Sequence, residues 1–155
     1  MVQSVTLTWP ELMIGATVGV MRQVQNLRAG RVDRFGCDPE SGWAVHIEGA
    51  CGEMAVAKLL GKFWSGAIGN LRADDVGELQ VRTRSKAHYD LIVHPSDPDD
   101  RAFIHVTGSS PTYLVVGWIL GRDAKQQSFW RDPAGGRPAF FVPASALHSI
   151  DGLTR

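Results

Sequence analysis

The chain has 155 residues, about the length of one ordinary domain and enough to bury a sizeable core. Its 16 basic and 16 acidic residues give a formal net charge of zero, so binding to nucleic acid or membrane through global charge is excluded and any basic surface must be local. Cys37 and Cys51 lack metal-ligand or redox spacing, and no segment has the character of a signal peptide or a membrane span. We therefore expect a single domain over 1–155 with free thiols, in a cytoplasmic protein that does not enter membranes.

The first strong signal along the chain is a helix start at "TWPEL". Thr8 can cap the helix, and Glu11 three residues later completes a capping box. Gly30 is a typical C-terminal stop. Apolar residues recur at helical spacing and predict the packing face of this helix: Leu12, Ala16, Val20, Val24 and Leu27. The aperiodic segment 30–42 is predicted to be a loop.

A second helix is predicted from about Ser41 to Leu60, with Gly61 as its stop. Glu53 lies in the middle of its small and apolar stripe. The stripe consists of Gly49, Gly52, Glu53, Val56, Ala57 and Leu60. Each interior glycine costs a helix about 1 kcal/mol relative to alanine, which indicates a close backbone approach at these positions.

After residue 70 the pattern changes to short runs rich in valine, isoleucine and aromatic residues. Strands are predicted at 78–84, 89–94, 102–108, 112–121 and 139–142, a short helix within 122–130, and a helical turn within 143–150. "PSDPDD" between two of the strands is predicted to be an exposed hairpin turn. This order of elements indicates the α/β (α+β) class, with a mixed central sheet flanked by helices.

The stretch "DDVGELQVRTR" places unusual charge around one predicted strand. Strand alternation sends Leu79, Val81 and Thr83 into the core, while Glu78, Gln80 and Arg82 line the opposite face. Asp75 precedes them across Gly77. A carboxylate, a second oxygen ligand and a cation at one bend are what a hard divalent metal and a phosphate require. The competing interpretation is a charged, solvated hairpin.

"GACGEMAVAKLLG" followed by "DDVGELQVRTR" resembles the core of the PD-(D/E)XK nuclease superfamily, and the chain with "GWILGRDA" and "PAFFVP" is similar to small phage and prophage proteins. The resemblance implies a restriction-endonuclease-like core over 43–155, preceded by an extra N-terminal helix and loop over 1–42. In it Glu53 is the helix glutamate, Asp75 the metal aspartate, Gln80 the variable ligand and Arg82 the basic position.

The function implied by this resemblance is hydrolysis of DNA phosphodiester bonds with Mg²⁺ or Mn²⁺. The implied metal ligands are Asp75, Gln80, Glu53 and the Val81 carbonyl, with Glu78 able to replace Gln80 if the strand register shifts. The family usually has lysine where this chain has Arg82, and a carboxylate where it has Gln80. The alternative is therefore a catalytically inactive nuclease-like fold that binds DNA or a protein partner.

Three further cations are predicted to contact nucleic acid: Arg84, Arg122 and Lys125. Arg122 and Lys125 follow Gly121 at the predicted start of a helix, where side chains and helix dipole could meet a phosphate together. The five histidines show no metal-ligand spacing, which argues against a zinc site. A tryptophan could stack on unpaired bases only if it were exposed near the site.

Overall fold

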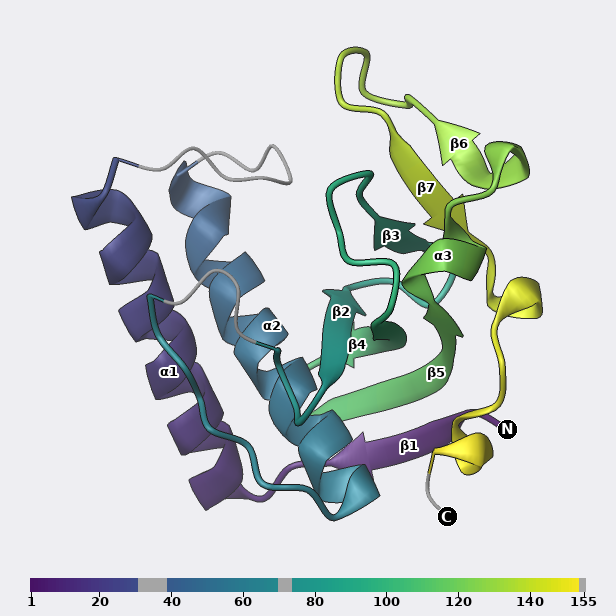
Figure 1. Cartoon of the computed structure of the whole chain (residues 1–155). Helices are drawn as coiled ribbons and strands as arrows, with labels where there is room; N and C mark the ends of the chain where they lie inside the picture. Colours follow the sequence, from purple (N-terminus) through teal and green to yellow (C-terminus); the bar gives the residue numbers. More distant parts are fainter. Residues whose placement is uncertain (31–38, 70–73, 154–155) are drawn as a thin grey trace.

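The computed structural model describes residues 1–30, 39–69 and 74–153, and Figure 1 shows its arrangement. Two long helices, α1 (Trp9–Arg28) and α2 (Pro39–Leu60), lie side by side, and α2 lies between α1 and a four-stranded sheet. In Figure 1 a smaller three-stranded sheet lies above the large one, on the side away from β1. The predicted α+β class with a mixed sheet is confirmed, but the strands form two sheets where one central sheet was expected.

The large sheet has the order β1-β5-β4-β2. Its strands are β1 (Gln3–Thr6), β2 (Leu79–Arg84), β4 (Ala102–Ser109) and β5 (Thr112–Leu120). β2 runs parallel to β4, whereas the β4–β5 and β5–β1 pairs are antiparallel. Among the strands that the structure describes, β2 therefore occupies one end of the sheet, and one of its edges has no partner strand.

The small sheet has the order β3-β7-β6 and joins β3 (Leu91–Val93), β6 (Trp130–Arg131) and β7 (Ala139–Val142). Its connections include α3 (Gly121–Ala124) and 3₁₀ turns at Gln127–Phe129, Ala144–Ala146 and Ile150–Gly152. The helix predicted within 122–130 is thus a four-residue helix and a separate 3₁₀ turn. β1 and β6 were not predicted, because each is too short to give a periodic signal of its own.

The ends of α1 are as predicted, but its buried face is not. Thr8 and Glu11 form the complete capping box. The residues turned toward α2 are Gly15, Gly19 and Gln23, whereas the predicted face leaves Val20, Val24 and Leu27 exposed at 38%, 41% and 52%. The reason is the closeness of the two helices: a Cβ on Gly19 would lie 2.4 Å from the Cα of Ile47.

The bounds of α2 agree with the prediction to within two residues, and Gly61 ends the helix with a φ of +63°. The close approach predicted for Gly52 is confirmed, since a Cβ there would lie 1.9 Å from the Oγ1 of Thr83 on β2. For Gly49 it is wrong, because nothing lies within 4 Å of that position. Of these two glycines, Gly52 is therefore the one at which α2 and β2 approach closely.

The main core fills the space between α2 and the large sheet, and a second core lies between the large sheet and the small one. The main core includes Cys51, Val56, Val81, Ile104, Val106, Tyr113 and Val115. Because Val81 enters this core, the predicted alternation along β2 is confirmed at that position.

Within the part of the chain that the structure describes, no helix has both the length and the apolar character needed to cross a membrane.

Candidate functional site

Asp75 lies in a tight turn that folds back along the free edge of β2. The N–H groups of Asp75 and Val76 both donate to the Leu79 carbonyl, at 3.0 and 3.2 Å, and Gly77 makes the turn with a φ of +57°. The Asp75 carboxylate then accepts the Val81 N–H through Oδ2 at 2.7 Å. The N–H and C=O of one strand residue point to the same side, so the Val81 carbonyl also faces this edge.

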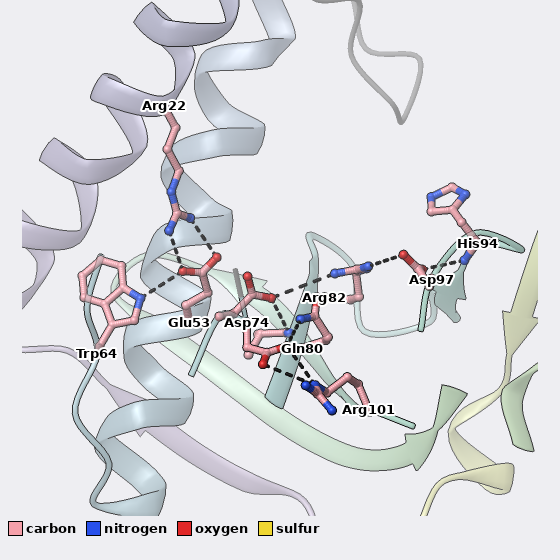
Figure 2. A network of polar contacts seen from close by, with 11 residues as sticks. Arg22, Glu53, Trp64, Asp74, Gln80, Arg82, His94, Asp97 and Arg101 are labelled. Atoms are coloured by element: carbon pink, nitrogen blue, oxygen red, sulfur yellow. Dashed lines mark hydrogen bonds and ion pairs between the residues drawn. The ribbon is translucent and has the colours of Figure 1, made fainter. Parts of the chain in front are cut away.

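Glu53 is buried on α2 and is held by two side chains from outside that helix (Figure 2). Arg22 of α1 donates from Nη1 to Oε1 at 2.8 Å and from Nη2 to Oε2 at 2.9 Å. Trp64, just after α2, donates its indole N–H to Oε2 at 2.9 Å. Arg22 is itself positioned by a bond from Nε to the Ala67 carbonyl at 3.0 Å. Bidentate charge-assisted pairs of this kind combine strength with fixed orientation.

Glu53 and Asp75 influence each other electrostatically. Burial, and then repulsion by the Glu53 charge, raise the pKa of Asp75 to about 7, although the Val81 N–H, Arg82 and Arg22 all act to lower it. Two acids from different elements are therefore crowded beside the free edge of β2, in an environment that disfavours the second negative charge.

Gln80 faces a different carboxylate, that of Asp74. Its Nε2 donates to Asp74 Oδ1 at 2.7 Å, and Arg101 donates from Nε to the two oxygens of Asp74 at 3.2 and 3.3 Å (Figure 2). Glu78 is exposed, and its charge acts on Arg101. The structure thus brings Gln80 next to Asp74. The NH2 group of the Gln80 amide donates to that carboxylate, so the amide oxygen is the Gln80 atom with the chemistry of a metal ligand.

Arg82 bridges Asp75 and a carboxylate that the sequence did not reveal. Its Nη2 donates to Asp97 Oδ1 at 3.1 Å, its Nη1 lies 4.0 Å from Asp75 Oδ2, and its guanidinium carbon lies 5.0 Å from the centroid of the Phe103 ring. Asp97 is 7% exposed, and its Oδ2 accepts the His94 N–H at 2.8 Å. Arg82 is therefore oriented from two sides.

The prediction of an exposed hairpin turn at "PSDPDD" is correct for the turn and for the exposure of five of its six residues, but wrong for the hairpin and for Asp97. This segment connects β3 of the small sheet to β4 of the large one, so the two flanking strands are not a hairpin. Within this segment the Asp97 side chain points inward and is buried. The only local signal was an aspartate three residues after His94, a spacing suited to a side chain that accepts a backbone N–H.

Two of the three cations expected to contact nucleic acid are engaged within the protein. Arg84 is half-buried, donates to the Asp90 carbonyl at 2.9 Å and lies over the Tyr89 ring at 4.7 Å. Lys125 donates to the Asp97 carbonyl at 2.5 Å and to Asp99 Oδ1 at 2.6 Å. A phosphate would have to compete with these bonds.

Arg122 has an exposed side chain, but the helix behind it is not a phosphate site. The N–H groups of Gly121 and Arg122, which begin α3, donate to the carbonyls of Arg101 and Asp99 at 2.9 and 3.0 Å. The helix has four residues, so its dipole is small and its first amides are already satisfied. The predicted cooperation of side chain and helix dipole is therefore wrong.

An open cavity of about 420 Å³ lies beside this network, and we call it the Asp75 cavity. Its lining residues are Lys62, Phe63, Ser65, Asp74, Asp75 and Gly77. Over the ranges 1–30, 39–69 and 74–153, no three His, Cys, Asp or Glu side chains are grouped as a ready-made metal site. A cation at this edge would thus rely on Asp75 together with neutral oxygens.

The fold and the site define a mixed α/β domain with a charge-compensated acidic cluster at a sheet edge. Comparisons of the chain with protein-family models, with curated proteins and with solved structures found no match. The function therefore has to be inferred from the geometry of the site.

Proposed function

We propose that the chain is a phage-type, metal-dependent nuclease of the cytoplasm that hydrolyses DNA phosphodiester bonds on a restriction-endonuclease-like core. The observation that carries this proposal is the position of Asp75, partly buried at the edge of β2 under the influence of the Glu53 charge: burial first, and then repulsion by Glu53, raise the pKa of Asp75 to about 7. A strongly perturbed carboxyl beside an open cavity is typical of a functional site. A divalent cation would relieve the repulsion that the protein has left there.

The residues present fit Mg²⁺ or Mn²⁺, which prefer oxygen ligands. Asp75, the Gln80 amide oxygen and the Val81 carbonyl would hold the ion, and Glu53 would contribute charge from α2. When bound, such an ion lowers the pKa of a water molecule and polarises a phosphodiester. No carboxylate on β2 itself is needed in this arrangement.

The chain's own residues would then orient and neutralise the substrate. Arg82 stays protonated, so it can stabilise negative charge that develops on the phosphate but cannot take a proton from water. Asp97 fixes the direction of its guanidinium. Arg22 and Trp64 fix Glu53 and so keep the second acid beside Asp75.

The test is cleavage of supercoiled, linear and branched DNA in the presence of Mg²⁺, Mn²⁺ or EDTA. Asp75→Asn keeps an acceptor for the Val81 N–H and removes the charge, so it should abolish metal-dependent cleavage without unfolding the protein. Asp132→Asn, an exposed carboxylate in the β6–β7 loop, is the matched control and should cut normally. Cleavage by Asp75→Asn at the wild-type rate would overturn the proposal.

A second function, a catalytically silent module that binds DNA or a protein, is favoured by a different observation. Both oxygens of Glu53 already accept hydrogen bonds, and Arg82 is paired with Asp97. Such a network needs no metal for its charge balance. Wild-type protein that binds DNA or a protein partner and cuts no substrate would support this alternative.

A further inference from the structure

Phe63 is the most exposed large apolar side chain in the described part of the chain, at 87%. It lies in the segment that follows α2 and lines the Asp75 cavity together with Asp74 and Asp75. Exposed single apolar residues are common on protein surfaces. An aromatic ring at the rim of an acidic cavity, however, offers a flat face directly beside the groups proposed to act on a phosphodiester.

The backbone that carries Phe63 is fixed on both sides. Before it, the chain turns at Gly61, and the Lys62 N–H donates to the Ala57 carbonyl at 2.9 Å. After it, Trp64 is anchored inward by its indole bond to Glu53 at 2.9 Å. Because Trp64 points inward, Phe63 projects outward from a fixed position relative to Glu53.

Two residues whose side chains can donate hydrogen bonds to a phosphate line the same cavity as Phe63. Lys62 is exposed, and its ammonium makes no hydrogen bond or ion pair with any residue that the structure describes. Its stem passes over the turn before β2, since its Cδ would lie 3.8 Å from a Cβ on Gly77. The Ser65 hydroxyl also lines the cavity. An aromatic residue, a lysine and a serine thus line the same cavity as the two aspartates.

We propose that Phe63 and Lys62 form a binding site for unpaired nucleotides of DNA, in which the Phe63 ring stacks on a base and Lys62 contacts the adjacent phosphate. This inference rests on the proposed nuclease function for the choice of DNA over RNA and for the role of the neighbouring aspartates. Stacking needs a base whose face is free, and in a continuous duplex both faces are covered by neighbouring base pairs. The substrate class is therefore a single strand, a flap or a frayed end.

The binding test uses fluorescence anisotropy with a labelled single strand, the blunt duplex of the same sequence and the equivalent RNA, in EDTA so that no strand is cut. The single DNA strand should bind more tightly than the duplex. Phe63→Ala should weaken this binding by about 5- to 150-fold, the equivalent of the roughly 1–3 kcal/mol that stacking on one base contributes. Phe63→Trp should retain it, and Phe63→Leu should behave like the alanine variant.

Lys62→Gln separates the phosphate contact from stacking. It should lower the affinity for every DNA form and reduce the salt dependence of binding by about one counterion. Met13→Ala, which removes an apolar side chain 71% exposed on α1, is the control and should bind as wild type. Unchanged binding by Phe63→Ala, retained binding by Phe63→Leu, or tighter binding to duplex or RNA would each overturn the inference.

The cleavage assay distinguishes failure of the proposed Phe63–Lys62 binding site from failure of the nuclease proposal. Ring-dependent binding to the single strand without metal-dependent cleavage would retain the binding site and reject the enzyme. Metal-dependent cleavage that requires Asp75 and is indifferent to Phe63→Ala would retain the enzyme and reject the binding site.

Discussion

Arg22 on α1 and Glu53 on α2 form a bidentate ion pair, with Nη1–Oε1 and Nη2–Oε2 distances of 2.8 and 2.9 Å. The Glu53 side chain is 8% exposed and that of Arg22 is 21% exposed. The pair joins the outer helix to the inner one and fixes the acid that acts on Asp75. Its consequences for stability differ from those of a surface pair.

Replacing Arg22 with methionine should destabilise the protein by about 3–5 kcal/mol, because it leaves a buried carboxylate without its cation. Lys58→Met is the matched control, since Lys58 is 39% exposed where it pairs with Glu11, and exposed pairs contribute about 0–1 kcal/mol. Urea unfolding of both variants measures the difference. Equal losses in the two variants would show that the buried pair has no special weight.

Metal should stabilise the protein through Asp75. At a concentration about ten times its dissociation constant, Mg²⁺ or Mn²⁺ adds about 1.4 kcal/mol, which for a chain of this size raises Tm by about 3–6 °C. Asp75→Asn should remove this rise. A thermal melt with and without the ion tests it, and the same rise in the variant would place the bound ion elsewhere.

The stability of the metal-free protein should fall as pH rises from about 4 to about 7, between the pKa values of Asp75 in the unfolded and folded states. Its pKa is about 7 in the folded protein and about 3.9 in an unfolded chain, so between these values the folded state holds the extra proton. Across this pH range the free energy of unfolding falls by at most about 4 kcal/mol.

The measurement is the free energy of unfolding of Asp75→Asn minus that of wild type, in EDTA. This difference should grow from about pH 4 to about pH 7 and then level off. Burial lowers the pKa of His105, which destabilises both proteins at acid pH, and this effect cancels in the difference. A difference that stays flat across the range would contradict the assigned environment of Asp75.

Two glycines of α2 offer a matched pair of substitutions. Gly52→Ala should cost about 1–3 kcal/mol, because the new Cβ would lie 1.9 Å from Thr83 Oγ1 and push α2 away from β2. Gly49→Ala meets no atom within 4 Å and should stabilise the helix by up to about 1 kcal/mol. Denaturant midpoints of the two variants should move in opposite directions; movement in the same direction would mean that the spacing of α2 and β2 is looser than described.

Arg82 separates an active enzyme from a silent module. Arg82→Ala should abolish cleavage and weaken DNA binding, whereas Arg82→Lys should retain or raise cleavage, because a lysine amine can assist the attacking water and an arginine cannot. Arg82→Ala also leaves Asp97 unpaired, so Arg82→Ala should be compared with the double variant that adds Asp97→Asn. Metal-dependent cleavage and DNA binding that persist unchanged in Arg82→Ala would exclude the assigned role.

The sequence predicted those features that depend on neighbours along the chain. The Thr8 cap, the stop at Gly61 and the alternation that buries Val81 are local, and the structure has all of them. The exposed side of α1 was misassigned because periodicity locates a stripe without saying whether a partner covers it. Here the close contact of α1 and α2 admits only small side chains, so the large ones lie outside.

Two partners of the site residues, Arg22 and Asp97, could not be predicted, because they come from other elements of the fold. Arg22 is 31 residues from Glu53, and no spacing in the sequence links the two. Asp97 reaches Arg82 only because the chain crosses from one sheet to the other between β3 and β4. Single-sequence patterns identify acids and bases but do not pair them across such distances.

The bond from the Val81 N–H to Asp75 has a consequence for solubility. An edge strand with open backbone groups is a template for pairing with another chain, and proteins protect such edges with charges and turns. The turn at Asp75–Leu79 covers the edge of β2 in this way, and the carboxylate occupies the amide that a foreign strand would use. Loss of this acceptor, as in Asp75→Ala, should leave the Val81 N–H open to intermolecular β-pairing, so the residue proposed to hold the metal also protects the edge of the sheet.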